Sequence, residues 1–301
     1  MNFGRIQIED KPLFDRLLSM SPYVDCEYLF STLFMWQDVL GYQRAIEDDC
    51  IFIRHLFNGK MQYHVPICAP ERIPEQVKKL MADDSGKLEL FCVTKEHMEQ
   101  LGPEMMKHFT AEENRNFADY LYRGEDLRTL TGKKYHQKRN HISKFQKAYD
   151  WSFKIFTEAG SELIECMKVL EQWDINKLEN ASWHEKLLVG NEMNALDKCM
   201  KHFNAMGLIG GVLYIDGQPK GFTVGETVAR GGIKVGVVHY EKCDSNYTGI
   251  YQVINRLFSE NALGEADYIN REDDMGVEGL RKSKLTYHPV RLVEKYTLKE
   301  I

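Results

Sequence analysis

The sequence between Leu208 and Tyr240 reads LIGGVLYI-DGQPK-GFTVGETV-AR-GG-IKVGVVHY, in which short links separate three apolar runs. The links contain Asp216-Gly217 and Gly231-Gly232, which are residue pairs typical of tight hairpin turns. This pattern predicts three consecutive antiparallel strands, over residues 208–215, 221–228 and 233–240.

Helical and strand patterns on both sides of these strands complete one α/β unit. Before them we expect a strand over 151–156, a helix from 161 to about 173 and a second helical stretch that ends near Met200. After them we expect a helix over 249–263, a strand over 267–270, a helix over 277–287 and a strand over 290–298. One β-α-β crossover in this order predicts a mixed, mostly antiparallel sheet flanked by helices.

The first part of the chain has a comparable order of elements. Strands are expected over 42–46, 51–56 and 61–67, with turns at Asp48-Asp49 and Asn58-Gly59. A helix over 74–81, a strand over 88–93 and a helix capped by Thr94 follow. The similar order predicts two tandem units, which we place at residues 1–134 and 135–301.

Composition and charge restrict the class of protein. The 301 residues are 43% hydrophobic and 28% charged, so the chain is globular and not disordered. The formal net charge of -6 argues against indiscriminate coating of nucleic acid, although a local basic patch remains compatible with it.

Cysteine usage and the N-terminal residues bear on the compartment. The seven cysteines form no CxxC motif, so spacing predicts neither a zinc ribbon nor a redox pair, and we expect reduced thiols in a cytoplasmic protein. The first ten residues resemble no secretory signal. The most apolar stretch, Tyr28–Trp36, is about half the ~20 residues that span a bilayer. Its aromatic residues favour core packing over an assembly interface.

Residues 127–149 contain no acidic side chain in an otherwise acidic protein. Apolar side chains fall on one helical stripe there, so the helix is expected to pack on one side and to present basic groups on the other. The basic groups that we expect to meet a phosphate-bearing ligand, such as a coenzyme or a tRNA end, are Lys133, Lys134, Lys138 and Arg139. A solvated helix face without a ligand is the competing interpretation.

A second polar stretch runs from Tyr268 to Pro289, after a predicted strand and across the start of a helix. Ligands of α/β sheets often bind at such strand ends. Asp273 can accept a proton, and Arg281 and Lys284 can stabilise charge. The pattern is equally compatible with a structural role. Asp274 would then cap the helix, and the basic side chains would interact with the helix dipole. Asp273 and Asp274 offer two metal ligands but spacing places no third one, so no metal is predicted.

A third stretch, from Val237 to Tyr251, runs from the end of a strand through a polar loop into the next helix. Its residues Tyr247, Thr248 and Gly249 precede free N–H groups at the helix start, which can hold an anion. An ordinary strand–loop–helix connection would have the same pattern.

Several of these segments together resemble a known family. The segments are YLYRGEDLRTLTGKKYHQKRN at 120–140, Glu241-Lys242 with Gly249 and Tyr251, NREDDMG at 270–276, LRKSK at 280–284, and Pro289. They are similar to the family named after the C-terminal domain of phosphatidylglycerol lysyltransferase. This resemblance implies two tandem GNAT-like (acyl-CoA N-acyltransferase-like) folds and the transfer of an acyl or aminoacyl group to an amine or hydroxyl.

The resemblance also indicates where a donor would bind. In GNAT enzymes the coenzyme pyrophosphate binds a loop of the form Gln/Arg-x-x-Gly-x-Gly/Ala after the long central strand. The matching segment here, Asp244-Ser-Asn-Tyr-Thr-Gly249, keeps one glycine, which favours aminoacyl-tRNA over acyl-CoA as donor. The expected donor-binding residues are Lys133, Lys134, Lys138, Arg139, Tyr247, Thr248, Gly249 and Tyr251.

Two functional hypotheses remain open at this point. The first is an acyl- or aminoacyl-transferase without a tightly bound cofactor, in which a small-molecule, peptide or lipid acceptor attacks the donor directly. Asp273 or Glu241 would orient the amine as base, and Arg281 or Lys284 would stabilise charge. The second is a non-catalytic module that binds RNA or a phosphorylated ligand. An open, polar cleft beside Gly249 would favour the first hypothesis, and a filled one the second.

Overall fold

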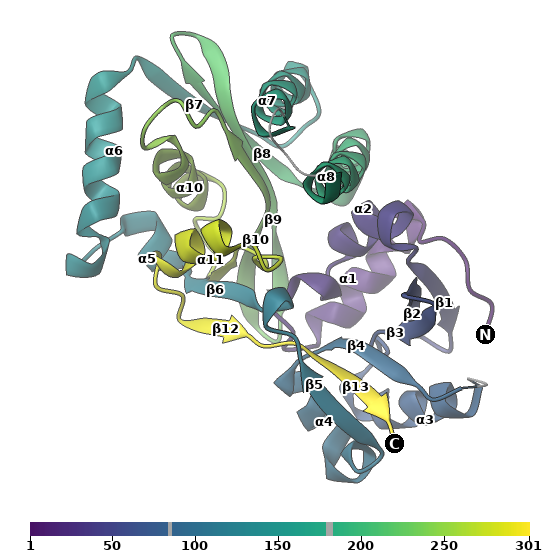
Figure 1. The fold of residues 1–301 in the computed structure, drawn as a ribbon. Coiled ribbons are helices and arrows are strands. Elements are labelled where there is room, and N and C mark those ends of the chain that lie inside the picture. Colours follow the sequence, from purple (N-terminus) through teal and green to yellow (C-terminus); the bar gives the residue numbers. More distant parts are fainter. Residues whose placement is uncertain (84–85, 179–182) are drawn as a thin grey trace.

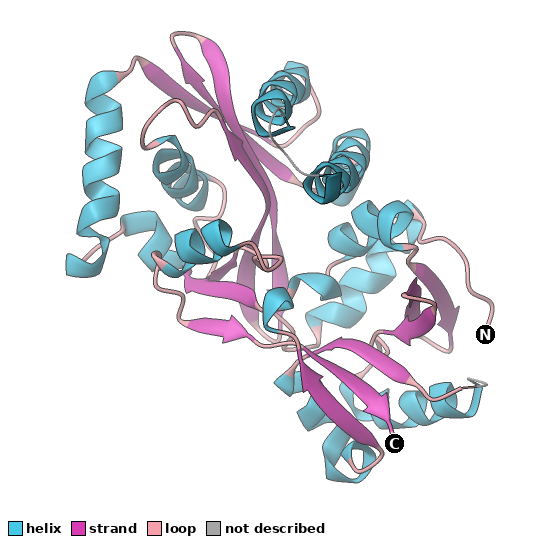
Figure 2. Cartoon of the chain, viewed as in Figure 1, coloured by secondary structure: helices cyan, strands magenta, loops and turns pink. Residues whose placement is uncertain are grey.

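The computed structural model in Figure 1 describes residues 1–83, 86–178 and 183–301. Two mixed sheets are flanked by helices, as the colouring by secondary structure in Figure 2 shows. Each sheet has one parallel strand pair joined by a helical crossover, within residues 60–93 and 233–270, and the other pairs of neighbouring strands are antiparallel. The expected class, α/β with mixed, mostly antiparallel sheets flanked by helices, is confirmed.

The first sheet has six strands in the order β1-β2-β3-β4-β13-β5. Its strands are β1 (Gln43–Glu47), β2 (Cys50–Phe57), β3 (Lys60–Tyr63), β4 (Glu89–Val93), β5 (Phe109–Glu113) and β13 (Tyr296–Glu300). The helices of this part are α1 (Lys11–Ser19), α2 (Phe30–Leu40), α3 (Ile73–Asp83) and α4 (Lys95–Met106). Thr94 caps α4 as predicted, because its side chain accepts a hydrogen bond from the His97 amide.

The second sheet has seven strands in the order β12-β6-β11-β10-β9-β8-β7. They are β6 (Asp119–Arg123), β7 (Trp151–Phe156), β8 (Ile209–Ile215), β9 (Gln218–Arg230), β10 (Ile233–Cys243), β11 (Tyr268–Asn270) and β12 (Arg291–Val293). Its helices are α5 (Gly124–Thr129), α6 (His136–Ala148), α7 (Ser161–Leu178), α8 (Trp183–Lys201), α9 (Phe203–Met206), α10 (Ile250–Asn261) and α11 (Glu278–Leu285). The three predicted strands between 208 and 240 are β8, β9 and β10, antiparallel as expected.

Helices cover both faces of the second sheet. In Figure 1, α5, α6, α10 and α11 lie on one face, and α7 and α8 lie on the other, beside α2. The aromatic segment joins the two parts, since Phe30 and Phe34 are buried and Lys198 of α8 lies 4.5 Å from the Phe34 ring. The prediction of core packing for this segment is confirmed.

Five short 3-10 helices connect the larger elements in the described part of the chain. They are Ile8–Asp10, Cys26–Tyr28, Pro70–Arg72, Arg115–Phe117 and Lys133–Tyr135. The segment Cys26–Tyr28 precedes α2 and lies at the junction of the two parts.

Two predicted strands differ from the structure. The strand expected over 61–67 ends at Tyr63, and Ile67 pairs instead with Ile51 of β2 in an isolated bridge. The strand expected over 290–298 is divided into β12 and β13, which belong to different sheets. Lys295, between them, is 1% exposed because it turns inward to Glu27 and Asp119 at the junction.

Strand exchange links the two parts of the chain. β6 precedes residue 134 but lies in the second sheet, and β13 follows it but lies in the first. Each sheet therefore contains strands from both sides of the predicted boundary between residues 134 and 135. The division of the chain at that boundary stays a prediction.

Candidate functional site

The candidate site is centred where the backbones of the parallel strands β10 and β11 separate beyond Val237 and Asn270, and we call this separation, which side chains occupy, the opening. β10 and β11 pair only over Val235–Val237 and Tyr268–Asn270, after which β10 continues to Cys243 without this partner. A β-bulge interrupts the pairing of β10 with β9 between Val238 and Tyr240, so His239 is the extra residue. Bulges often redirect side chains next to binding sites, and strand ends in α/β sheets are where ligands bind.

His239 connects three elements at this opening. Its Nδ1 lies 2.8 Å from Glu272 Oε1, and its Nε2 lies 3.1 Å from Glu226 Oε1 of β9. Ser31 of α2 donates to the same Glu226 oxygen. Burial alone would lower the pKa of His239, but the two carboxylates outweigh it and raise this pKa to about 9. His239 is therefore a buried cation at neutral pH.

Glu241, one of the predicted catalytic residues, forms a largely buried ion pair across the opening. Its Oε1 accepts a hydrogen bond of 3.0 Å from Arg271, which follows β11, and its Oε2 accepts one of 3.2 Å from Asn255 of α10. The Arg271 guanidinium also lies 5.0 Å from the Tyr287 ring. Both Glu241 oxygens are thus occupied, which limits this carboxylate as a free base.

The loop after β11 separates the two predicted aspartates. Asp274 is 0% exposed and binds Arg281 through two hydrogen bonds of 2.8 and 2.9 Å, with a further 2.5 Å bond from Tyr120. Burial acts to raise the pKa of Asp274, but the hydrogen bonds from Arg281 and Tyr120 lower it. Arg281 and Asp274 thus neutralise each other, and the two aspartates do not form a shared metal site.

Asp273 has a different environment from Asp274. Burial raises the pKa of Asp273 to about 7, and the nearby carboxylates Glu27 and Asp119 act in the same direction against Lys295. Its Oδ1 accepts a 2.8 Å hydrogen bond from the Met275 amide. A carboxyl that titrates near neutral pH can exchange a proton with a substrate.

Lys284 holds the same loop in place. Its Nζ donates to the carbonyl oxygens of Arg271, Glu272 and Asp273, at 2.6 Å to the first. The side chain is buried, and burial lowers its pKa. Lys284 therefore positions the backbone that carries Glu272 and Asp273.

The basic helix α6 borders a surface pocket of about 240 Å³. The residues that line it are Lys134, Gln137, Lys138, His141, Gln252, Thr286 and His288. Lys138 donates a 2.7 Å hydrogen bond to Thr286 and lies 3.8 Å from the Tyr287 ring. Burial, with a contribution from Arg271, lowers the pKa of Lys138 to about 8. Lys138 of this pocket and Arg271 of the ion pair with Glu241 therefore both contact the Tyr287 ring.

The other predicted donor-binding residues on α6 and just before it have different roles. Lys134 also forms a 3.0 Å ion pair with Asp126, and Lys133 is exposed. Arg139 donates to the carbonyl oxygens of Leu130 and Gly132, so it fixes the turn that leads into α6.

The start of α10 is covered by α6. Gly249 is the N-cap of α10 with φ +94°, and a Cβ built there would lie 2.8 Å from the His141 carbonyl oxygen. Thr248 is exposed, the Tyr247 ring packs 5.2 Å from Tyr149, and the Tyr251 hydroxyl donates to the Cys243 carbonyl. The backbone at Gly249 is therefore closed, whereas the polar pocket next to it is open.

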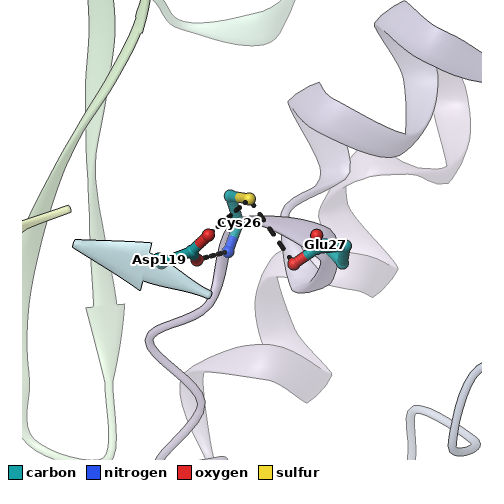
Figure 3. A group of neighbouring side chains, drawn as sticks. All are labelled: Cys26, Glu27 and Asp119. Atoms are coloured by element: carbon teal, nitrogen blue, oxygen red, sulfur yellow. Dashed lines mark hydrogen bonds between the residues drawn. The ribbon is translucent and has the colours of Figure 1, made fainter. Parts of the chain in front are cut away.

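A buried charged cluster lies where the two parts of the chain meet (Figure 3). Cys26, Glu27 and Asp119 bring one potential metal-ligating atom each to within 4.8 Å of one another. The Lys295 Nζ lies 2.7 Å from Asp119 and 3.5 Å from Cys26 Sγ, and it also contacts Glu27. Because this ammonium group already supplies the positive charge, the cluster is an internal ion-pair network.

Comparison with known sequences identifies the family. The family model described as phosphatidylglycerol lysyltransferase, C-terminal, matches residues 20–299. The chain belongs to this family. The residues around His239 lie within the matched range.

Two similar proteins have no stated function. A conserved protein of unknown function from Bacteroides thetaiotaomicron VPI-5482 is 31% identical, with both chains covered completely and a TM-score of 0.89. An uncharacterized protein from Mycoplasmoides gallisepticum is 31% identical over 190 residues, 61% of this chain and 56% of the relative. The chain thus spans about half the length of that curated relative.

A more distant solved structure shows the same fold. L-PGS from Bacillus licheniformis matches with a TM-score of 0.69 at 15% identity, over 97% of this chain and 92% of that one. Within the described residues, no helix has both the length and the apolar character to cross a bilayer. The cytoplasmic location of this family member stays a prediction.

Several residues of this site were not predicted from the sequence. Glu226, His239, Arg271 and Glu272 were not among the predicted site residues, although the last three lie in polar stretches that were singled out. A histidine inside the otherwise apolar run VGVV-H-Y was a usable signal. The bulge that places it had no signature in the sequence.

Proposed function

We propose that this chain transfers an aminoacyl group from an aminoacyl-tRNA to an amine or hydroxyl acceptor. The observation that carries the proposal is the separation of β10 and β11 at the His239 bulge, together with a basic pocket whose Lys138 contacts the same Tyr287 ring as Arg271. Membership of an acyltransferase family and this arrangement support the same reaction class.

The donor's phosphates would bind at the pocket beside α6. Lys134 and Lys138 supply positive charge there, and His141, Gln252 and His288 add polar groups. Because α6 packs against the backbone at Gly249, the binding of a coenzyme pyrophosphate at the start of α10 is disfavoured. The open pocket next to it suits a tRNA end, whose phosphates can lie along the surface of α6.

The reacting ester would lie in the opening at His239. A bulge leaves one residue outside the ladder, so a backbone N–H group there can stabilise the oxyanion that forms when the acceptor attacks the ester. Positively charged His239 adds to this stabilisation. The enzyme thus acts by positioning and electrostatics, without a covalent intermediate.

Asp273 is the base that we favour. Its pKa of about 7 suits proton removal from an attacking amine, whereas Glu241 is held by Arg271 and Asn255. The acceptor amine or hydroxyl attacks the ester carbonyl carbon, Asp273 takes the acceptor's proton, and the tRNA ribose oxygen leaves and takes up a proton.

A non-catalytic RNA-binding module is the second candidate. It is favoured by the internal pairing of Glu241, Arg281 and Lys284, three of the four predicted catalytic residues. Such a module would keep the basic pocket and would not transfer the aminoacyl group.

Transfer from a panel of labelled donors distinguishes these candidates. The purified chain would be incubated with radiolabelled aminoacyl-tRNAs or acyl-CoAs, together with phosphatidylglycerol vesicles, peptides or small amines. We expect label to move from at least one aminoacyl-tRNA to an acceptor. Binding of tRNA without any transfer would support the second candidate, and transfer from acyl-CoA alone would overturn the choice of donor.

A further inference from the structure

Two buried cysteines of the first sheet lie side by side on neighbouring strand segments. Cys50 is the first residue of β2, and Cys68 follows the segment that leaves β3. Their exposed fractions are 0% and 1%. Both thiols are free, and neither residue belongs to the opening at His239.

The backbone between these segments fixes the spacing of the two cysteines. Ile51 and Ile67 form an antiparallel bridge and exchange both of their N–H···O bonds, each 2.9 Å long. Cys50 and Cys68 flank this bridge, one on each segment, at the position that a non-hydrogen-bonded pair has in a regular antiparallel ladder. Opposite residues in such pairs have Cα atoms about 4.5 Å apart with side chains on the same face, which lies within the range for disulfides of about 4.4–6.8 Å.

The two thiols also interact chemically. A hydrogen bond from Cys50 lowers the pKa of Cys68, and the charge of Arg72 acts in the same direction, against burial and the carboxylates of Glu71 and Glu75. Cys68 is therefore the better nucleophile of the pair. It is followed by Ala69, which is partly exposed, so Cys68 lies one residue from the surface along the chain.

The other cysteines provide a contrast. Burial raises the thiol pKa values of Cys92 and Cys243, and Cys26 contacts the carboxylates Glu27 and Asp119 and the ammonium of Lys295. A buried thiol whose pKa is raised is less reactive toward peroxide.

We propose that Cys50 and Cys68 are an oxidation site that takes hydrogen peroxide and closes to an intramolecular disulfide. The Cys68 thiolate attacks one peroxide oxygen, forms a sulfenic acid and releases water after proton uptake. The Cys50 sulfur then attacks the sulfenic sulfur, and the displaced hydroxide leaves as water with the Cys50 proton. Overall, two thiols and one hydrogen peroxide give one disulfide and two water molecules.

The disulfide would stabilise the segment between the two strands. It closes a ring over residues 50–68, which contains the β2–β3 hairpin and Val65, whose amide donates a 2.8 Å hydrogen bond to the Tyr28 hydroxyl. Tyr28 belongs to the buried segment at the junction of the two parts. Restricting this ring in the unfolded chain raises the melting temperature of the oxidised protein, by about 5 °C.

Peptide mapping of the whole, unmodified chain is the primary test. The reduced protein is treated with hydrogen peroxide, remaining thiols are alkylated, and the chain is digested without reductant. We expect a peptide that links Cys50 to Cys68, a mass loss of two hydrogens, and reversal of both changes by dithiothreitol. Seven alkylated thiols after treatment, or a disulfide between other cysteines, would overturn the proposal.

One variant locates the nucleophile, and a second serves as a control for the disulfide. Cys50→Ser should leave a sulfenic acid at Cys68 that dimedone labels, and Cys243→Ala should still form the Cys50–Cys68 disulfide. If Cys50→Ser does not fold, the same labelling at an early time point in the unmodified chain replaces it. Dimedone labelling at Cys50 and not at Cys68 would overturn the assignment of Cys68 as nucleophile.

Discussion

Nδ1 of His239 lies 2.8 Å from Oε1 of Glu272, and this contact spans the two parallel strands at the point where they separate. The bulge on β10 turns His239 toward the junction, where Glu226 and Ser31 complete its surroundings. A buried cation is thus held between two carboxylates at the centre of the candidate site.

Stability should depend on pH through His239. Its pKa is raised from about 6.5 to about 9, so its contribution is complete below the unfolded pKa and is lost as the pH rises through about 9. The shift corresponds to about 3 kcal/mol. We expect His239→Gln to be less stable than the wild type at pH 6 and to approach it at pH 10, as measured by denaturant unfolding. A constant difference between these pH values would contradict the ionised state of His239.

The Glu241–Arg271 pair should contribute strongly to stability. Both side chains are about 10% exposed, so Glu241→Gln leaves a buried guanidinium without its counter-charge. We expect a loss of about 3 kcal/mol in the free energy of unfolding. The control is Lys107→Gln, which breaks an exposed pair with Glu104 and should change stability by about 0.5 kcal/mol or less. Equal effects of the two variants would argue against a buried pair.

Gly249 should tolerate alanine less well than another glycine of similar conformation. Gly249 and Gly217 both have positive φ, but only at Gly249 does an added Cβ meet the backbone, at 2.8 Å from the His141 oxygen. We expect Gly217→Ala to cost about 1 kcal/mol and Gly249→Ala about 1–3 kcal/mol more, from thermal or denaturant unfolding. A smaller cost at Gly249 would mean that α6 does not pack on this residue.

Lys295 should be required for the junction of the two parts. Lys295→Met leaves Glu27 and Asp119 buried without a cation, and we expect a loss of about 3 kcal/mol or more. Adding Asp119→Asn to this variant should restore part of the stability, because one uncompensated carboxylate is removed. Strictly additive losses in the double variant would contradict direct coupling between Lys295 and Asp119.

The pocket lysines should control tRNA binding through charge. Lys134→Gln with Lys138→Gln should weaken binding and reduce the salt dependence, with a slope of log affinity against log salt that is smaller by about 1.5. Lys201→Gln, on α8, is the matched control and should leave the slope unchanged. An unchanged slope in the double variant would place the tRNA elsewhere.

The sequence predicted the fold class because its periodicities are local. Asp216-Gly217 and Gly231-Gly232 specify hairpins through their own backbone preferences, and the meander of β8, β9 and β10 followed. The exchange of β6 and β13 between sheets was not predictable, since it depends on contacts of Lys295 with residues far away in the chain.

The candidate site was predictable only as stretches of polar residues. Two of the stretches, 268–289 and 237–251, contain Arg271, Glu272, His239 and Glu241. The contacts among these side chains, however, join segments that are far apart in the sequence. Asp273 and Asp274 are adjacent in sequence, yet one has a raised and the other a lowered pKa, because only Asp274 meets Arg281 and Tyr120. Burial and partner geometry, which sequence spacing does not contain, decide between the two.

The central claim is that a donor binds at the α6 pocket with its ester in the opening at His239. A crystal structure with a non-hydrolysable aminoacyl-adenosine phosphate analogue tests it most directly. We predict density for the phosphate beside Lys134 and Lys138 and for the aminoacyl carbonyl beside the bulge at His239. An analogue bound away from both places would contradict the account.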